Sequence, residues 1–182
     1  MAGRTVTRVL LVLCAWLSLA HAAPAPVVRE ALAVKGYRVE IDTRPWARVL
    51  RDKDKFDGVL VLWPDEVTAM SLHHYLPIFR SRVGFYTRVD TPVDTRNLAA
   101  LYQRTVGIAR GYGYPRVVFE SGFDLVEQTD DLTNLRMLHG RRFDLVVIER
   151  PVGEHIIKTQ LPEALDKLVW NEPALAEVSL GL

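Results

Sequence analysis

The sequence predicts an α/β fold in which parallel strands alternate with helices. The clearest evidence is the stretch from residue 105 to 148, where short apolar segments alternate with segments of helical pattern. The strand-like segments are 105–110, 123–127 and 143–148, and the helical ones begin near Pro115 and Asp130. Alternation on this scale is typical of a parallel sheet with crossover helices. Ligands of such sheets bind at the carboxyl ends of the strands, which here lead into a glycine turn and into Glu149.

Strand and helix patterns also fill the first half of the chain. Residues 37–42 alternate apolar and polar side chains, as a half-buried strand does, and the apolar run 56–63 predicts a strand buried on both faces. Helices are predicted from Val27 to Gly36 and from Pro45 to about residue 50. The other segments of this half are a solvated charged turn at 51–55, an irregular surface segment at 72–79 and an alternating strand at 82–88.

The first 22 residues have the pattern of a secretory signal. Arg4 and Arg8 precede an apolar run from Val9 to Leu19, and the small residues around His21 suit a cleavage site. The apolar run is shorter than the roughly 18 residues that a membrane-spanning helix needs. We therefore expect cleavage after Ala22, with an uncleaved membrane anchor as the alternative.

Composition excludes several classes of function for the remaining chain. The only cysteine, Cys14, lies within the signal, so the mature chain has no disulfide, thiolate metal site or cysteine nucleophile. Without Arg4 and Arg8, the 23 basic side chains fall below the 22 acidic ones, and no block of like charge suggests nucleic acid or an anionic membrane surface. The expected protein is soluble and exported, with no stable membrane insertion after cleavage and no cofactor or metal.

Several short motifs follow one another in a specific order along the chain. They are PWAR at 45–48, FDG at 56–58, PI at 77–78, GIARGYGYP at 107–115, NL at 134–135, GRRFD at 140–144 and Glu149. This series resembles the family 3 periplasmic solute-binding proteins, the amino-acid receptors of bacterial ABC transporters. The resemblance covers nearly all of residues 27–182 and implies a two-lobed, periplasmic-binding-protein-like architecture of type II. It implies a partial lobe 1 at 23–87, a lobe 2 at 88–175 and the start of a second hinge strand at 176–182.

Three departures from the family pattern make the expected architecture incomplete. The chain after the signal lacks an opening central strand, and it stops at Leu182, where family members continue with helices that return to the first lobe. Thr68 stands where the family has an arginine that clamps the ligand carboxylate. A missing central strand leaves its neighbours without hydrogen-bonding partners unless they pair directly. Threonine donates one neutral hydrogen bond, whereas arginine makes a bidentate, charge-assisted contact.

The resemblance and the positions of the residues together nominate a ligand-binding set. Its members are Trp63, Thr68, Arg110, Gly111, Tyr112 and Glu149. The glycine turn is expected to offer backbone N–H groups to an anion, or else only to supply a positive φ. The resemblance implies that Glu149 pairs with a ligand amino group, and the alternative is a surface acid that caps the next helix. Trp63 is a ligand wall or a core aromatic, and Arg110 is a substitute clamp or an exposed strand-end arginine.

The function expected from these residues is ligand binding rather than catalysis. The resemblance implies a periplasmic receptor, monomeric, that binds a small polar ligand such as an amino acid and is recognised by the membrane subunits of an ABC transporter. One alternative is a degenerate member of the family that no longer binds. Another is a dehydratase or hydrolase on the same fold, for which Glu149 is the only plausible catalytic acid.

Overall fold

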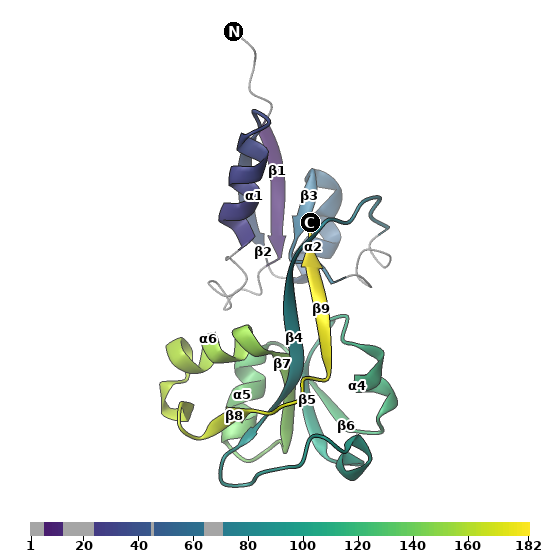
Figure 1. The fold of residues 1–182 in the computed structure, drawn as a ribbon, viewed down its shortest axis with the longest axis vertical. Helices are drawn as coiled ribbons and strands as arrows, with labels where there is room; N and C mark the ends of the chain where they lie inside the picture. Colours follow the sequence, from purple (N-terminus) through teal and green to yellow (C-terminus); the bar gives the residue numbers. More distant parts are fainter. Residues whose placement is uncertain (1–5, 13–23, 45, 64–70) are drawn as a thin grey trace. The chain divides into compact units, whose positions relative to one another are not determined.

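The computed structural model describes residues 6–12, 24–44, 46–63 and 71–182 (Figure 1). The chain divides into two compact units, one of residues 1–80 with 179–182 and one of residues 81–178. Both units mix helices and strands, which confirms the predicted α/β class. The chain passes from the first unit to the second within β4 (Pro77–Arg88) and returns within β9 (Ala176–Gly181), and these two strands pair. The strand predicted at 82–88 therefore begins earlier, in the segment that was expected to be irregular.

A three-stranded parallel sheet forms the first unit, in the order β2-β1-β3. Its elements are β1 (Val6–Val12), β2 (Arg38–Arg44), β3 (Gly58–Leu60), α1 (Pro24–Ala33), α2 (Trp46–Asp52) and the 3-10 turn η1 (Lys53–Lys55). All seven residues of β1 pair with β2, and residues 9–11 also pair with β3. In the full chain, residues assigned to the signal take the place of the central strand, which the chain after Ala22 does not contain. Cleavage after Ala22 stays a prediction.

The apolar run at 56–63 forms a shorter strand than its pattern predicts. β3 ends at Leu60 because Val61 adopts a φ of 69°, which turns the backbone out of the extended conformation. The N–H groups of Val61 and Leu62 both donate to the carbonyl of Gly181, so this part of the chain pairs with the end of β9 instead. Residues 59–63 are nevertheless buried, as expected, and Val59 and Leu62 belong to the core of the first unit.

The second unit is built on a sheet with the order β6-β5-β7-β4-β8, and β9 pairs with β4. Its strands are β5 (Thr105–Ala109), β6 (Asp124–Gln128), β7 (Leu145–Glu149) and β8 (Leu168–Trp170), together with β4. Its helices are α4 (Arg116–Glu120), α5 (Asp131–His139) and α6 (Arg150–Gln160), with 3-10 turns η2 (Leu98–Leu101) and η3 (Pro162–Ala164). β5 is parallel to β6 and β7, whereas β4 is antiparallel to β7 and β8. The strands and helices predicted between 105 and 148 are thus confirmed.

Local contacts explain why these elements form where they do. Asp130, where the sequence predicts that a helix begins, caps α5 by accepting a hydrogen bond from the Thr133 N–H at 2.7 Å. Asp144 accepts a hydrogen bond from the Thr105 N–H at 3.1 Å and so joins the starts of β5 and β7. Within the residues described here, no helix is long and apolar enough to cross a membrane.

Candidate ligand-binding site

The carboxyl ends of three parallel strands meet at one edge of the second unit. β5 lies between β6 and β7, with Ala109 opposite Gln128 and Val106 opposite Leu145. Because this register continues along the strands, Ala109 comes level with Ile148, and the residues that follow it come level with Glu149. The structure therefore brings Arg110, Gly111, Tyr112 and Glu149, which the sequence placed after separate strands, to the same edge of the sheet.

The glycine turn after β5 is held in a defined conformation. Gly111 has a φ of +79°, a backbone conformation that side-chain-bearing residues rarely adopt. The buried Tyr114 hydroxyl accepts a hydrogen bond from the Ala109 N–H at 2.9 Å, and the ring of Tyr112 lies 5.9 Å from that of Tyr114. A tyrosine from the end of the turn thus reaches back to the end of the strand.

Arg110 points its guanidinium along the neighbouring strand. Its backbone N–H donates to the Gln128 carbonyl at 2.9 Å, and its Nε donates to Glu127 Oε2 at 3.3 Å. The Arg110 side chain is 69% exposed, and ion pairs in such exposed positions contribute only about 0–1 kcal/mol. A ligand carboxylate could therefore replace Glu127 as its partner at little energetic cost.

Glu149 is the last residue of β7 and is buried, with 7% of its surface exposed. It lies opposite Val83 of β4 and directly precedes α6, but its side chain does not cap that helix. The alternative of a surface acid that caps the helix is therefore not supported. A carboxylate held at the end of a central strand is placed as a ligand contact would be, since burial strengthens its interaction with a cation.

The two remaining nominated residues belong to the first unit. Trp63 follows β3 and is buried, with 6% of its surface exposed. Thr68, which the resemblance places at the position of a clamping arginine, lies outside the residues that the structure describes.

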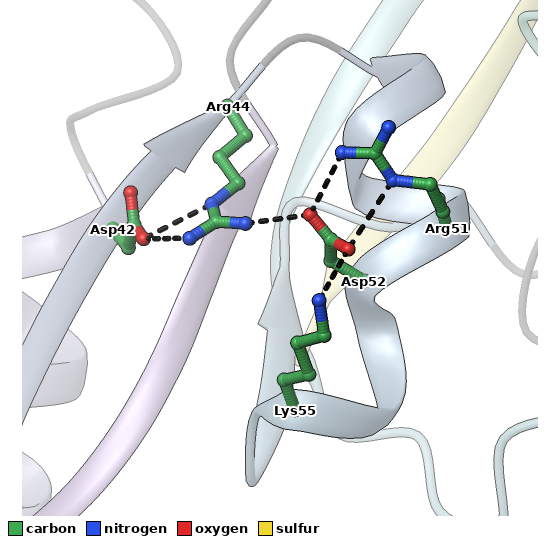
Figure 2. A network of polar contacts seen from close by, with 5 residues as sticks. All are labelled: Asp42, Arg44, Arg51, Asp52 and Lys55. Atoms are coloured by element: carbon green, nitrogen blue, oxygen red, sulfur yellow. Dashed lines mark hydrogen bonds and ion pairs between the residues drawn. The ribbon is translucent and has the colours of Figure 1, made fainter.

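A polar network in the first unit was missed by the sequence reasoning (Figure 2). Arg44 at the end of β2 donates to Asp42 Oδ2 at 2.7 Å and, through Nη1, to Asp52 Oδ2 at 2.6 Å. Asp52 at the end of α2 also accepts hydrogen bonds from Arg51 Nε at 3.3 Å and Lys55 Nζ at 2.9 Å. These hydrogen bonds, first that of Arg51 and then that of Lys55, hold the pKa of the Asp52 carboxyl far below its usual range. The network ties β2 to α2.

Asp52 also corrects the interpretation of 51–55 as a solvated turn, because it is buried, with only 4% of its surface exposed. The signal that could have revealed this is its spacing. Asp52 stands three residues after Val49, which is fully buried, and residues three apart share one face of a helix. In the part of the chain that the structure describes, no three His, Cys, Asp or Glu side chains gather as a metal site would require.

Solved structures share this fold over nearly the whole chain at low sequence identity. A histidine kinase sensor domain with similarity to periplasmic binding proteins is 19% identical, with a TM-score of 0.77, and the match covers 98% of this chain and 82% of that one. The GluR0 ligand-binding core in complex with L-glutamate is 14% identical, with a TM-score of 0.76 and coverage of 98% and 84%. The arginine-bound form of truncated ArgBP from T. maritima is 14% identical, with a TM-score of 0.71 and coverage of 98% and 87%.

No protein-family model matches the chain, and no curated protein matches it either. The evidence for the fold is therefore structural, and the resemblance seen in the motifs agrees with it. The chain has the α/β fold of the periplasmic binding proteins and of the receptor and sensor domains built on that fold.

Proposed function

We propose that this protein is an exported solute-binding receptor for a small polar ligand, an amino acid or a related compound, and that it serves an ABC transporter in the periplasm. The observation that carries the proposal is the edge of the second unit where Arg110, the Gly111 turn and Glu149 meet at the ends of β5 and β7. The same fold holds L-glutamate in the GluR0 core and arginine in ArgBP.

The charges at this edge match the two ends of an amino acid. Glu149 is assigned to the ligand's amino group. The exposed guanidinium of Arg110 is assigned to the ligand's carboxylate, because Thr68 stands where the resembled family has its clamping arginine. The backbone N–H groups of Gly111 and Tyr112 add donors for the same carboxylate. Trp63 and Thr68 remain proposed ligand contacts of the first unit. Ligand binding then favours the conformation in which the protein makes the most contacts with the ligand, and the transporter subunits recognise that conformation.

Replacing Glu149 by glutamine tests this proposal. We expect a thermal melt of the full chain to be raised by one class of ligand from a panel of amino acids, small carboxylates and polyamines, since a ligand that binds the native state stabilises it. Loss of a charge-assisted contact of about 1.5–3 kcal/mol should raise the Kd in E149Q by roughly 10- to 100-fold. E163Q, which removes an exposed acid elsewhere in the second unit, is the matched control and should bind like the wild type.

Two other outcomes would overturn the receptor hypothesis. A cooperative melt that no compound shifts would indicate a degenerate protein that folds without binding. Turnover of a compound by the wild type, lost in E149Q, would indicate an enzyme with Glu149 as its catalytic acid. A receptor would lose affinity in E149Q without any turnover to lose.

A further inference from the structure

A hollow lies at the opposite edge of the second unit from the proposed ligand site. This cavity, of ≈ 390 Å³, is lined by Arg88, Asp90, His139, Arg141, Asp166 and Lys167, together with Val89. β4 runs antiparallel to β7, with Tyr86 opposite Val146, so the end of β4 at Arg88 lies beside the start of β7. Glu149 stands at the other end of the same strand. The cavity is therefore separate from the edge where Arg110 and Glu149 meet.

The wall of this cavity carries a guanidinium that is only partly satisfied. Arg88 is largely buried, with 11% of its side chain exposed, and its Nη1 donates to the carbonyl oxygens of Leu138 and Phe143. The Nε atom is buried and has no hydrogen-bond partner among the described residues. The nearest paired acid is Asp90, whose Oδ1 lies 3.8 Å from Nε, beyond hydrogen-bond distance. Buried N–H donors, above all charged ones, are stabilised by an acceptor.

Two guanidinium groups share the carboxylate of Asp90. The second belongs to Arg141, which donates from Nη2 to Asp90 Oδ2. Two arginines and the one carboxylate of Asp90 leave a net charge of +1 in this part of the cavity wall. At the rim, Lys167 and Asp166 cancel each other in formal charge, and neither forms an ion pair with a residue that the structure describes. The cavity is thus complementary to a single negative charge.

The backbone of Arg141 is held in an unfavourable conformation. Its φ is 61°, in the left-handed region, although Gly140 stands directly before it with an ordinary φ of −76°. This conformation closes the helix end, because the Arg141 N–H donates to the Leu138 carbonyl and the Arg142 N–H donates to the Met137 carbonyl. The end of α5 thereby places the Arg141 guanidinium beside the Asp90 carboxylate in the cavity wall.

We infer that this cavity binds a small oxyanion with one negative charge, seated between Arg88, Arg141 and Lys167. A guanidinium presents parallel N–H donors that match the two oxygens of a carboxylate or phosphate group, whereas a lysine supplies a point charge at the rim. The same chemistry is offered by a tetrahedral anion such as phosphate and by a carboxylate. Inorganic phosphate and acetate distinguish these two classes of anion.

The test measures anion binding to the full chain at constant ionic strength, by thermal shift and calorimetry with inorganic phosphate and with acetate. The wild type should be stabilised, and R141Q/K167Q should bind at least tenfold more weakly. K158Q/R116Q removes two exposed cations of the same unit outside the cavity and should behave as the wild type. Stabilisation by phosphate assigns the cavity to tetrahedral anions, and stabilisation by acetate alone assigns it to carboxylates.

A second variant separates binding from folding. R141G removes the cation and also relieves the positive φ, so it should raise the melting temperature without anion while abolishing the anion response. E149Q should keep the anion response, which makes this inference independent of the proposed receptor function. An absent response in the wild type, an equal loss in K158Q/R116Q, or a response that survives in R141G would overturn the inference.

Discussion

Deletion of residues 1–22, which cleavage after Ala22 would also produce, removes the whole of β1. That strand pairs through seven residues with β2 and through three with β3, and β2 and β3 are not neighbours in the sheet. A parallel ladder has about one hydrogen bond per paired residue, so on the order of ten are lost. At about 1 kcal/mol each, the loss is roughly 10 kcal/mol, which equals the stability of an ordinary domain at about 5–15 kcal/mol. The first unit should not fold without this strand.

Urea and thermal unfolding of residues 1–182 and 23–182, followed by circular dichroism, provide the assay. The shorter chain should show a smaller denaturant m-value, because only the second unit then buries surface in a cooperative transition. Deletion of residues 1–5 alone, which leaves β1 in place, is the control and should unfold as the full chain does. Equal m-values and equal midpoints for residues 1–182 and 23–182 would refute the role given to β1. Mass spectrometry of the secreted chain then shows whether its N-terminus keeps the strand.

Three further predictions concern single residues. D52N should lower the urea midpoint at neutral pH because it leaves Arg44, Arg51 and Lys55 without their shared carboxylate, whereas D54N, at an exposed acid, should not. Because the pKa of Asp52 is lowered in the folded state, its contribution to the stability of the fold is present above pH about 4 and is lost as the pH falls further. D52N should therefore flatten the decline of the urea midpoint between pH 6 and pH 3. Y114F should cost about 1–3 kcal/mol in unfolding experiments and weaken ligand binding, because the buried Ala109 N–H loses its acceptor, and unchanged stability and affinity would contradict the role of Tyr114 in fixing the turn. G107A should destabilise the chain by about 1–3 kcal/mol, because the added Cβ would lie 2.6 Å from Asn134 Oδ1 and from the Phe143 ring, and wild-type stability would show that these side chains move away freely.

Sequence patterns sufficed where the structure depends on neighbours in the chain. The order from β5 to β7 follows from apolar segments, the Asp130 cap and turns next to one another in sequence, and so does the meeting of Arg110 with Glu149 at one edge. Parallel strands place their carboxyl ends together whatever the details of the side chains.

The sequence predictions failed where one hydrophobic pattern fits two structures, or where a contact with a residue outside the local segment determines the structure. Residues 6–12 are apolar enough for a leader and also for a buried central strand, and local hydrophobicity does not distinguish these fates. The run at 56–63 was shortened by pairing of Leu62 with Gly181, more than a hundred residues away. Asp52 looked solvated because its partner Arg44 belongs to β2, outside the local charged run at 51–55.

The return of the chain through β9 has a consequence for the order of folding during synthesis. The second unit is one continuous segment, so all of it is available once residue 178 has emerged from the ribosome. The first unit is split, and Val61 and Leu62 wait for Gly181, which is translated after the whole of the second unit. Although domains near the N-terminus usually fold first during translation, the second unit can close here before the first is complete. The N-terminal part then stays incompletely folded for the longest time, and during that time it depends on the factors that prevent nascent chains from aggregating.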